Sequence, residues 1–328
     1  MRRRRLLVWM PAAGLALGVG RAIGQTPPRE LRRVGVLAPS TAAKEEIILK
    51  PFFDEMRKLG WVEGRNIRFD RAYADDRPEV MQQQAGALVL RTPEVVYAPP
   101  MVAATAAKQV TATIPIVFAT GIDPVGTGLV ASLAQPGGNV TGISSIADSL
   151  APKRVELWRQ IRPNASRFGV IGDPDDANTR SDRAALAALS DSLGLEIVFA
   201  PVTGISDLDA AIGLLAERKV DVVLSQSSLL FNLRKRLLEQ TRRRRLPVIG
   251  PRAELAADGS VLSYGSSLAE QIRRSAHLVD KVLKGAKPGE IPIEQPSTFE
   301  LVVNLQAARA LGISIPKAVL LQAEQVIE

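Results

Sequence analysis

The segment that decides the fold is residues 32–73, RRVGVLAPSTAAKEEIILKPFFDEMRKLGWVEGRNIRFDRAY. The apolar run 34–37 predicts a buried strand, and the amphipathic stretch 42–59 predicts a helix that ends at Gly60. Residues 66–73 then alternate apolar and polar side chains, which is typical of a second strand. Because the links are short, this strand–helix–strand unit predicts part of a parallel sheet.

The same alternation of strands and helices continues to about residue 143 and begins again at residue 168. It predicts strands at 94–97, 114–118, 139–143, 168–171, 195–199, 220–224, 246–249 and 259–263 and helices at 78–90, 102–110, 125–133, 180–193, 206–218 and 268–284. Repeated β/α units place helices on both faces of a parallel sheet. We therefore predict an α/β protein with two doubly wound parallel-sheet lobes joined by a hinge.

The N-terminal residues predict an export signal. Arg2–Arg5 precede 14 apolar residues, 6–19, and small residues follow at Ala22 and Gly24. Fourteen residues are fewer than the ~20 that span a bilayer as a helix, so we expect cleavage and a periplasmic mature chain, with an uncleaved anchor as the alternative. The net charge of +8 falls to +3 (37 basic and 34 acidic residues) without the five arginines of residues 1–24. A nucleic-acid partner is therefore not expected.

The sequence lacks the residues that several kinds of metal-binding and catalytic site require. The chain has no cysteine and one histidine, His277, which argues against thiolate or multi-histidine metal sites and leaves few routes to a catalytic triad. We expect a surface or structural role for His277. Gly126 and Gly128 match part of a dinucleotide fingerprint, but the preceding strand ends too early and Asp148 ends no clear strand. We therefore expect no enzyme activity, no cofactor and no metal.

Small polar turns follow the predicted strands, at the edge where open parallel sheets bind ligands. Several precede a helix N-terminus, whose free N–H groups suit an anion such as a carboxylate, while Asp123 suits an amine. The predicted ligand-binding residues are Ser40, Thr41, Met101, Thr120, Asp123, Asn178, Thr179, Ser225 and Gln226.

A basic run, Arg242 to Arg245, follows a helical pattern. We interpret it as a solvated helix end, where cations interact favourably with the helix dipole. A docking contact with another protein is the alternative.

Three blocks of sequence carry a family resemblance. Residues 114–142, IPIVFATGIDPVGTGLVASLAQPGGNVTG, resemble the signature of ABC-transporter substrate-binding proteins of the tryptophan/tyrosine-binding type. Residues 59–66, LGWVEGRN, and 294–305, EQPSTFELVVNL, resemble the same family. The resemblance extends from about residue 32 to the C-terminus.

The resemblance implies a type I periplasmic-binding-protein fold, in which the chain crosses between lobes several times. We therefore predict a signal peptide at 1–24, an N-terminal lobe from 32–147 plus 285–328, and a C-terminal lobe with a crossover helix from 148–284. The strand expected at 299–303, followed by a helix cap at Asn304, is assigned to the first sheet.

The resemblance also implies a function without catalysis. A small metabolite, with amino acids among the candidates, is trapped between the lobes and delivered to an inner-membrane ABC permease. The family turn places Asp123 at the ligand, and Asn178 and Thr179 keep the chemistry of a second family turn. We expect a monomer. The alternatives are an extracytoplasmic ligand-sensor subunit or an exported α/β enzyme.

Overall fold

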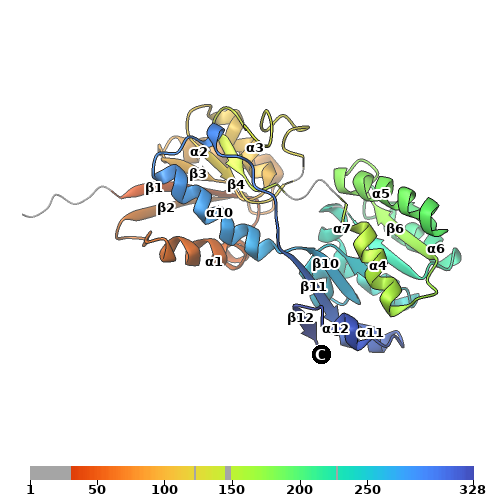
Figure 1. The fold of residues 1–328 in the computed structure, drawn as a ribbon. Coiled ribbons are helices and arrows are strands. Elements are labelled where there is room, and N and C mark those ends of the chain that lie inside the picture. Colours follow the sequence, from red (N-terminus) through yellow and green to blue (C-terminus); the bar gives the residue numbers. More distant parts are fainter. Residues whose placement is uncertain (1–30, 122, 145–148, 227) are drawn as a thin grey trace, which may run out of the picture. The chain divides into compact units, whose positions relative to one another are not determined.

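The computed structural model describes residues 31–121, 123–144, 149–226 and 228–328 (Figure 1). The described strands form two sheets, one with five strands and one with seven. We call the five-stranded sheet with its helices the first lobe, and the seven-stranded sheet with its helices the second lobe. The predicted signal peptide, residues 1–24, lies outside the described residues and stays a prediction. Among the described residues, no helix has the length and apolarity needed to cross a bilayer.

The first lobe is a parallel sheet in the strand order β2-β1-β3-β4-β5. Its strands are β1 (Arg32–Ala38), β2 (Ile67–Tyr73), β3 (Val95–Tyr97), β4 (Ile116–Phe118) and β5 (Val140–Gly142). Its helices are α1 (Ala42–Lys58), α2 (Pro78–Val89), α3 (Met101–Val110), α10 (Leu268–Leu283) and the short 3-10 helix η1 (Pro288–Glu290). Helices α1 and α10 cover one face of the sheet, and α2 and α3 cover the other.

Helix α10 is far from α1, α2 and α3 in sequence, but it packs tightly on the first lobe. The Ser275 hydroxyl on α10 is hydrogen-bonded to the buried hydroxyl of Tyr97, 2.8 Å away. The Tyr97 ring stacks on Phe52 of α1, with 3.9 Å between ring centroids. Ile272 and Ala276 of α10 are at most 1% exposed in the same core. Apolar burial and a satisfied hydrogen bond therefore hold α10 on the first sheet.

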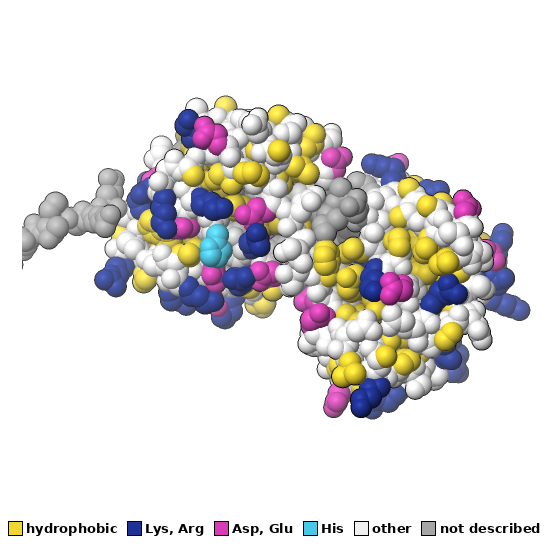
Figure 2. All heavy atoms as spheres, viewed as in Figure 1, with side chains coloured by type: hydrophobic (Ala, Val, Ile, Leu, Met, Phe, Trp, Pro, Cys, Tyr) yellow, Lys and Arg dark blue, Asp and Glu magenta, His cyan; other side chains and the backbone are white. Residues whose placement is uncertain are grey.

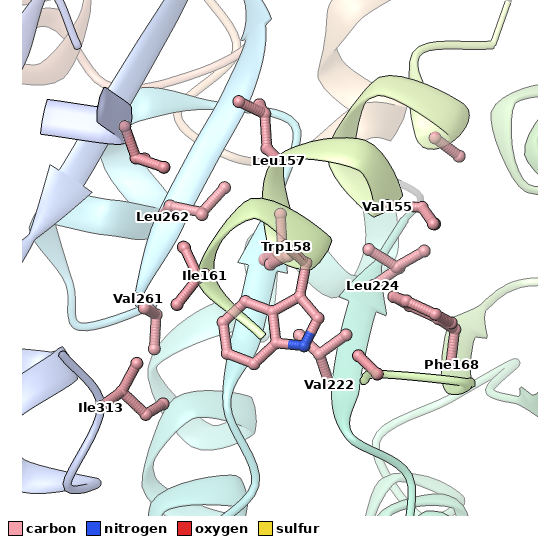
Figure 3. Packing of buried hydrophobic residues seen from close by; sticks show 14 of the residues in the cluster. Val155, Leu157, Trp158, Ile161, Phe168, Val222, Leu224, Val261, Leu262 and Ile313 are labelled. Atoms are coloured by element: carbon pink, nitrogen blue, oxygen red, sulfur yellow. The ribbon is translucent and has the colours of Figure 1, made fainter. Parts of the chain in front are cut away.

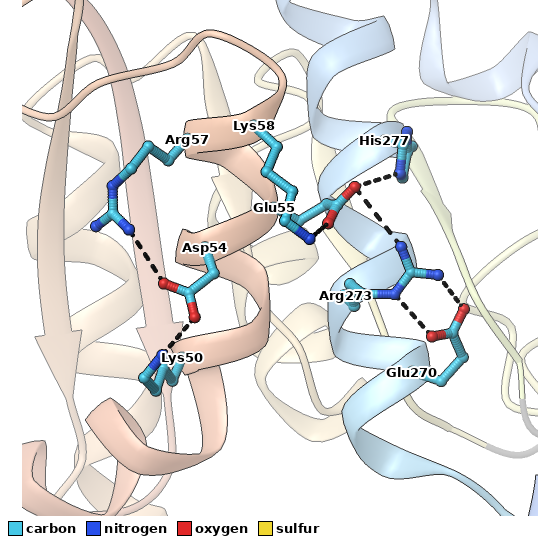
Figure 4. A network of polar contacts seen from close by, with 8 residues as sticks. All are labelled: Lys50, Asp54, Glu55, Arg57, Lys58, Glu270, Arg273 and His277. Carbon is cyan, nitrogen blue, oxygen red and sulfur yellow. Dashed lines mark hydrogen bonds and ion pairs between the residues drawn. The ribbon is translucent and has the colours of Figure 1, made fainter.

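A polar seam runs between α1 and α10 on the outside of this core (Figure 4). The Glu55 carboxylate accepts from Lys58 at 2.9 Å, and His277 Nε2 lies 3.2 Å from Glu55 Oε1. Arg273 lies 3.6 Å from the same oxygen and also pairs with Glu270. Figure 2 shows His277 at the surface among acidic and basic side chains. This arrangement agrees with the surface or structural role expected for His277.

The second lobe has the strand order β12-β11-β10-β9-β8-β6-β7. Its strands are β6 (Arg167–Gly172), β7 (Glu196–Pro201), β8 (Val222–Ser225), β9 (Val248–Gly250), β10 (Leu262–Ser266), β11 (Phe299–Asn304) and β12 (Gln325–Ile327). Its helices are α4 (Ala151–Ile161), α5 (Ala177–Leu193), α6 (Leu208–Glu217), α7 (Ser228–Asn232), α8 (Arg234–Arg243), α9 (Ala253–Ala257), α11 (Leu305–Ala310) and α12 (Lys317–Leu320). Strands β6 to β10 pair in parallel, and β11 runs antiparallel to β10.

The core of the second lobe centres on Trp158 of α4 (Figure 3). Its indole, 1% exposed, packs in a cluster with Val222 of β8 and Leu262 of β10. A second cluster on the other face of the sheet includes Leu215 of α6 and Leu237 of α8. The two clusters show that both faces of this sheet are covered, as the sequence predicts for a doubly wound lobe.

A buried ion pair joins three segments of the second lobe. Arg154 of α4 and Asp182 of α5 lie 3.2 Å apart, and their side chains are 5% and 6% exposed. The Arg154 Nε–H group also donates to the backbone oxygen of Tyr264 on β10, at 2.9 Å. The Ser149 hydroxyl donates to Asp182. Ser149 follows one crossing between the lobes and Tyr264 precedes another, so this cluster anchors the chain beside both crossings.

Three expectations about the fold are wrong. Strand β11 does not join the first sheet: it pairs with β10 from Leu262↔Val303 to Ser266↔Phe299. Helix α10 does not belong to the second lobe, because its apolar face is buried against the first sheet. Residues 125–133 form turns and bends rather than a helix, and Gly128 there has a φ of 71°, which a right-handed helix cannot accommodate.

We predict that Trp158→Ala lowers the free energy of unfolding by about 3–5 kcal/mol, because it removes a large buried side chain and leaves a cavity. Urea denaturation followed by circular dichroism measures the change. Leu90→Ala, at a side chain that is 85% exposed, is the control and should change stability by less than about 0.5 kcal/mol. Equal midpoints for Trp158→Ala and wild type would contradict the packing described above.

Candidate functional site

The first turn of the candidate site follows β1. The Ser40 N–H group donates to Glu45 at 3.0 Å, and the Ser40 hydroxyl donates to Asp76 at 2.7 Å. Lys44 pairs with the other oxygen of Asp76, also at 2.7 Å. Thr41 is the N-cap of α1, with no hydrogen bond from its side chain to the helix N–H groups. The turns after β1 and β2 are thus joined at the carboxyl edge of the sheet.

Neither acidic residue of this cluster, Glu45 or Asp76, is among the ligand-binding residues predicted from the sequence. Asp76 follows β2, where it and Asp75 have φ values of 59° and 52°. Asp is one of the residues that tolerate this left-handed conformation, so the Asp-Asp pair after a strand was the available signal. Glu45 is only 4% exposed. Burial raises its pKa, more than the hydrogen bond from Ser40 lowers it. Lys44 and Ser40 hold the pKa of Asp76 below its usual range.

The turns after β3 and β4 lie side by side, because Pro100 pairs with Thr120, and they contain Met101, Thr120 and Asp123. The Met101 N–H group donates to the Thr120 oxygen at 2.8 Å. Gly121 packs so closely on Met101 that an added Cβ would lie 2.6 Å from the Met101 Cβ. Asp123 is exposed, with a φ of 50°, and its Oδ1 accepts from the Gly126 N–H group at 2.8 Å. One Asp123 oxygen therefore closes the turn.

In the second lobe, the turn after β6 is organised by Asp176. Its Oδ1 accepts the N–H groups of Asn178 at 3.0 Å and Thr179 at 3.1 Å, which caps α5. Thr179 is 0% exposed and lies over Gly172, where an added Cβ would be 2.6 Å from the Thr179 hydroxyl oxygen. Thr179 thus packs inside the turn, while Asn178 is half-buried.

Ser225 and Gln226 stand beside this turn, because β8 pairs with β6. Ser225 is in register with Ile171, and the Gln226 N–H group donates to the Ile171 oxygen at 3.0 Å. Both residues are 3% exposed. Gln226 Nε2 is buried and has no hydrogen-bond partner among the residues that the structure describes. A buried donor without a partner costs free energy, roughly 1–3 kcal/mol, and this marks the position as one that a ligand could satisfy.

Each lobe thus gathers its predicted residues at one edge of its own sheet. Asn178, Thr179, Ser225 and Gln226 belong to two neighbouring strand ends of the second lobe. The five predicted residues of the first lobe lie in the turns after β1, β3 and β4. That any of the nine contacts a ligand stays a prediction.

The profile of the family described as ABC transporter substrate binding protein matches residues 33–327. The chain belongs to this family. It is 27% identical, over 265 residues, to the tyrosine-binding protein of Clostridioides difficile strain R20291; the match covers 80% of this chain and 76% of the relative.

Solved structures agree with this assignment. A conserved domain protein of Vibrio cholerae matches with a TM-score of 0.79 and 30% identity, covering 90% of this chain and 100% of the other. A Streptococcus pneumoniae ABC domain in complex with L-Trp matches with a TM-score of 0.76 and 25% identity, over the same shares. The family resemblance and the type I periplasmic-binding-protein fold expected from the sequence are confirmed.

We predict that Glu45→Gln removes a pH dependence of stability. Because burial raises the pKa of Glu45, the folded chain binds the proton more tightly than the unfolded chain. The free energy of unfolding therefore falls as pH rises from the usual carboxyl pKa, ~4.3, through the raised value. Gln keeps an acceptor for the Ser40 N–H group but does not titrate. The melting temperature of Glu45→Gln minus that of wild type should increase between about pH 4 and pH 8.

Asp54→Asn is the control of opposite sign. Lys50 lowers the pKa of Asp54, so wild type loses the contribution of this carboxylate as pH falls through the lowered pKa. The melting temperature of Asp54→Asn minus that of wild type should therefore decrease with rising pH. A pH-independent difference for Glu45→Gln would contradict the burial of an ionisable carboxyl group beneath the Ser40 turn.

Proposed function

We propose that this chain is the extracytoplasmic receptor of an ABC importer. It binds a free amino acid between the carboxyl edges of its two lobes, leaves it chemically unchanged and delivers it to a membrane permease. The export pattern of residues 1–24 supports the location. The names of two relatives, which refer to tyrosine and to L-Trp, support an amino acid as the ligand.

The unpartnered amide of Gln226 is the observation that carries the proposal. It lies directly after β8, at the edge where parallel sheets bind ligands, and its buried Nε2 donor has no partner within the described part of the chain. An amino acid's carboxylate would supply the missing acceptor. Hydrogen bonds to a charged group contribute about 1.5–3 kcal/mol, more than those between neutral groups.

The acidic side chains of the first lobe suit the other end of an amino acid. Asp123 is exposed and uses Oδ1 for its turn, and Asp76 stands at the neighbouring turn with Ser40. A carboxylate at either position can accept from an ammonium group. With a donor on one edge and carboxylates on the other, a zwitterion can bridge both lobes and favour their closure around it.

We predict that at least one free amino acid raises the melting temperature of residues 25–328. A ligand that binds only the folded chain, at 100 times its dissociation constant, adds about 2.7 kcal/mol to the free energy of unfolding. A thermal-shift screen of the protein amino acids, with tyrosine and tryptophan included, measures this. The amino acid must be recovered unchanged. Conversion of a compound to product, with no thermal shift from any amino acid, would indicate an exported enzyme instead.

We further predict that Gln226→Met weakens binding of that amino acid by about tenfold or more, because the variant has no donor for the carboxylate. The same change should keep or raise the melting temperature of the ligand-free chain, since it removes an unsatisfied buried donor. Calorimetric titration and thermal melting give the two readouts.

Gln240→Met is the matched control. Gln240 also has a buried atom, Oε1, for which the described residues supply no partner, but it lies on α8, away from the carboxyl edge. Its substitution should leave amino-acid binding within about twofold of wild type. Unchanged affinity in Gln226→Met would remove Gln226 from the site, and equal losses in both variants would indicate a general structural effect.

A further inference from the structure

Apart from the arginines of residues 1–24, the net positive charge of the chain is concentrated in one short stretch of the second lobe. Residues 234–245, RKRLLEQTRRRR, contain seven basic residues and one acidic residue, which gives a net charge of +6. Residues 25–328 as a whole carry 37 basic and 34 acidic residues, or +3, so the remainder of this range carries −3. We call residues 234–245 the basic stretch. It comprises α8 and the turn that follows it.

Four of the seven basic residues in the basic stretch form no ion pair with another described residue. Within the described residues, Arg234 pairs with Asp258, Arg243 with Glu239 and Arg244 with Asp209. The other four basic residues are exposed and form no ion pair within the described residues: Lys235, Arg236, Arg242 and Arg245. Unpaired cations clustered this closely repel one another, and an anionic partner would relieve the repulsion.

A cavity of about 310 Å3 opens beside the basic stretch. Its apolar walls include Leu238 of α8, Val248 of β9 and Ala310 of α11, and Arg242 lies at its side. Because Gly259 has no Cβ, the Arg242 guanidinium can lie close over its backbone; Nη2 is 3.2 Å from where a Cβ would be. Polar side chains also line the cavity, among them Arg242 and Asp258, and Asp258 is paired with Arg234. A pocket with apolar walls and polar groups beside them resembles the anchor sites of protein interfaces, where one buried side chain is surrounded by polar contacts.

The cavity is at the opposite end of the sheet from the candidate ligand site. Val248 begins β9 and Gly259 precedes β10, so the cavity lies at the amino ends of these parallel strands. The predicted ligand-binding residues of this lobe follow carboxyl ends. A partner bound at the cavity would therefore leave the ligand edge uncovered.

We propose that the basic stretch and its cavity dock an acidic segment of a protein partner, which inserts one apolar side chain between carboxylates. The concave cavity favours a protein over a lipid surface, because binding to a bilayer by insertion requires protruding apolar residues. None of the large apolar side chains that are exposed in the described residues lies in 234–245. This proposal does not depend on the identity of the transported ligand.

The test uses residues 25–328 and two fluorescent peptides, Glu-Glu-Leu-Glu-Glu and Glu-Glu-Ser-Glu-Glu, in anisotropy titrations. The leucine peptide should bind more tightly than the serine peptide, because only leucine fills the apolar cavity. Its affinity should fall as NaCl rises from about 50 to about 300 mM, because salt screens exposed charges. No binding of the leucine peptide at the lower salt concentration would overturn the proposal.

Two variants separate the charge from the cavity. Arg242→Gln/Arg245→Gln should weaken binding of both peptides, by about fivefold or more, because rim charges steer and hold an anionic partner. Ala310→Phe should obstruct the cavity and remove the preference for leucine. The matched control is Arg65→Gln/Arg91→Gln, which removes the same charge at two exposed first-lobe arginines and should stay within about twofold of wild type. Equal weakening in both double variants would show a net-charge effect and overturn the site.

Vesicles of phosphatidylglycerol and phosphatidylcholine provide the competing outcome. If they bind through Arg242 and Arg245 while the peptides do not, the surface contacts membrane and the protein-docking proposal is wrong. Each variant is also titrated with the amino acid that stabilises wild type. Unchanged amino-acid binding in Arg242→Gln/Arg245→Gln is expected, so failure of this proposal and failure of the proposed function can be distinguished.

Discussion

The burial of α10 against α1 is the constraint on which the rest of the architecture depends. Helix α10 follows β10 of the second lobe, yet its apolar face belongs to the core of the first lobe. The hydrogen bond between Ser275 and Tyr97, beneath the ring of Phe52, fixes it there. The chain must then return to place β11 beside β10. Neither lobe is therefore made from one continuous piece of chain, and three segments connect them.

This connectivity explains where polar groups are buried. The pair Arg154–Asp182 costs desolvation energy, and a buried ion pair offsets that cost only with good geometry and further hydrogen bonds. Here Ser149 and the Tyr264 oxygen supply them, and both stand next to crossings between the lobes. The cluster fixes the ends of two crossings on the second lobe.

Much of the fold could be predicted because each element carries its own local pattern. The apolar run 34–37, the stop at Gly60 and the cap at Asn304 all appear in the structure. Which of the two sheets β11 joins could not be predicted, because an apolar strand pattern is the same for any sheet edge. The helix expected at 125–133 failed because its glycines favour turns: Gly128 has a positive φ.

In the candidate site too, some features could be predicted from the sequence and others could not. Strand order along the chain is enough to place Ser40, Asp123 and Gln226 at strand ends. Sequence alone could not reveal that Thr179 is buried over Gly172, or that the Gln226 amide lacks a partner, because both depend on neighbours from other strands. Burial of Glu45 likewise arises from tertiary packing. The residue types that follow each strand are enough to locate the candidate site at the carboxyl edge. Tertiary packing then determines which of those side chains are accessible to a ligand.

We propose one amino-acid site, held between the carboxyl edges of both lobes. A crystal structure of residues 25–328 with the amino acid that stabilises the chain most tests this directly. We expect hydrogen bonds to that molecule from the first-lobe turns of Ser40 or Asp123 and from Gln226 of the second lobe. An amino acid bound to one lobe only, or bound away from both edges, would contradict it.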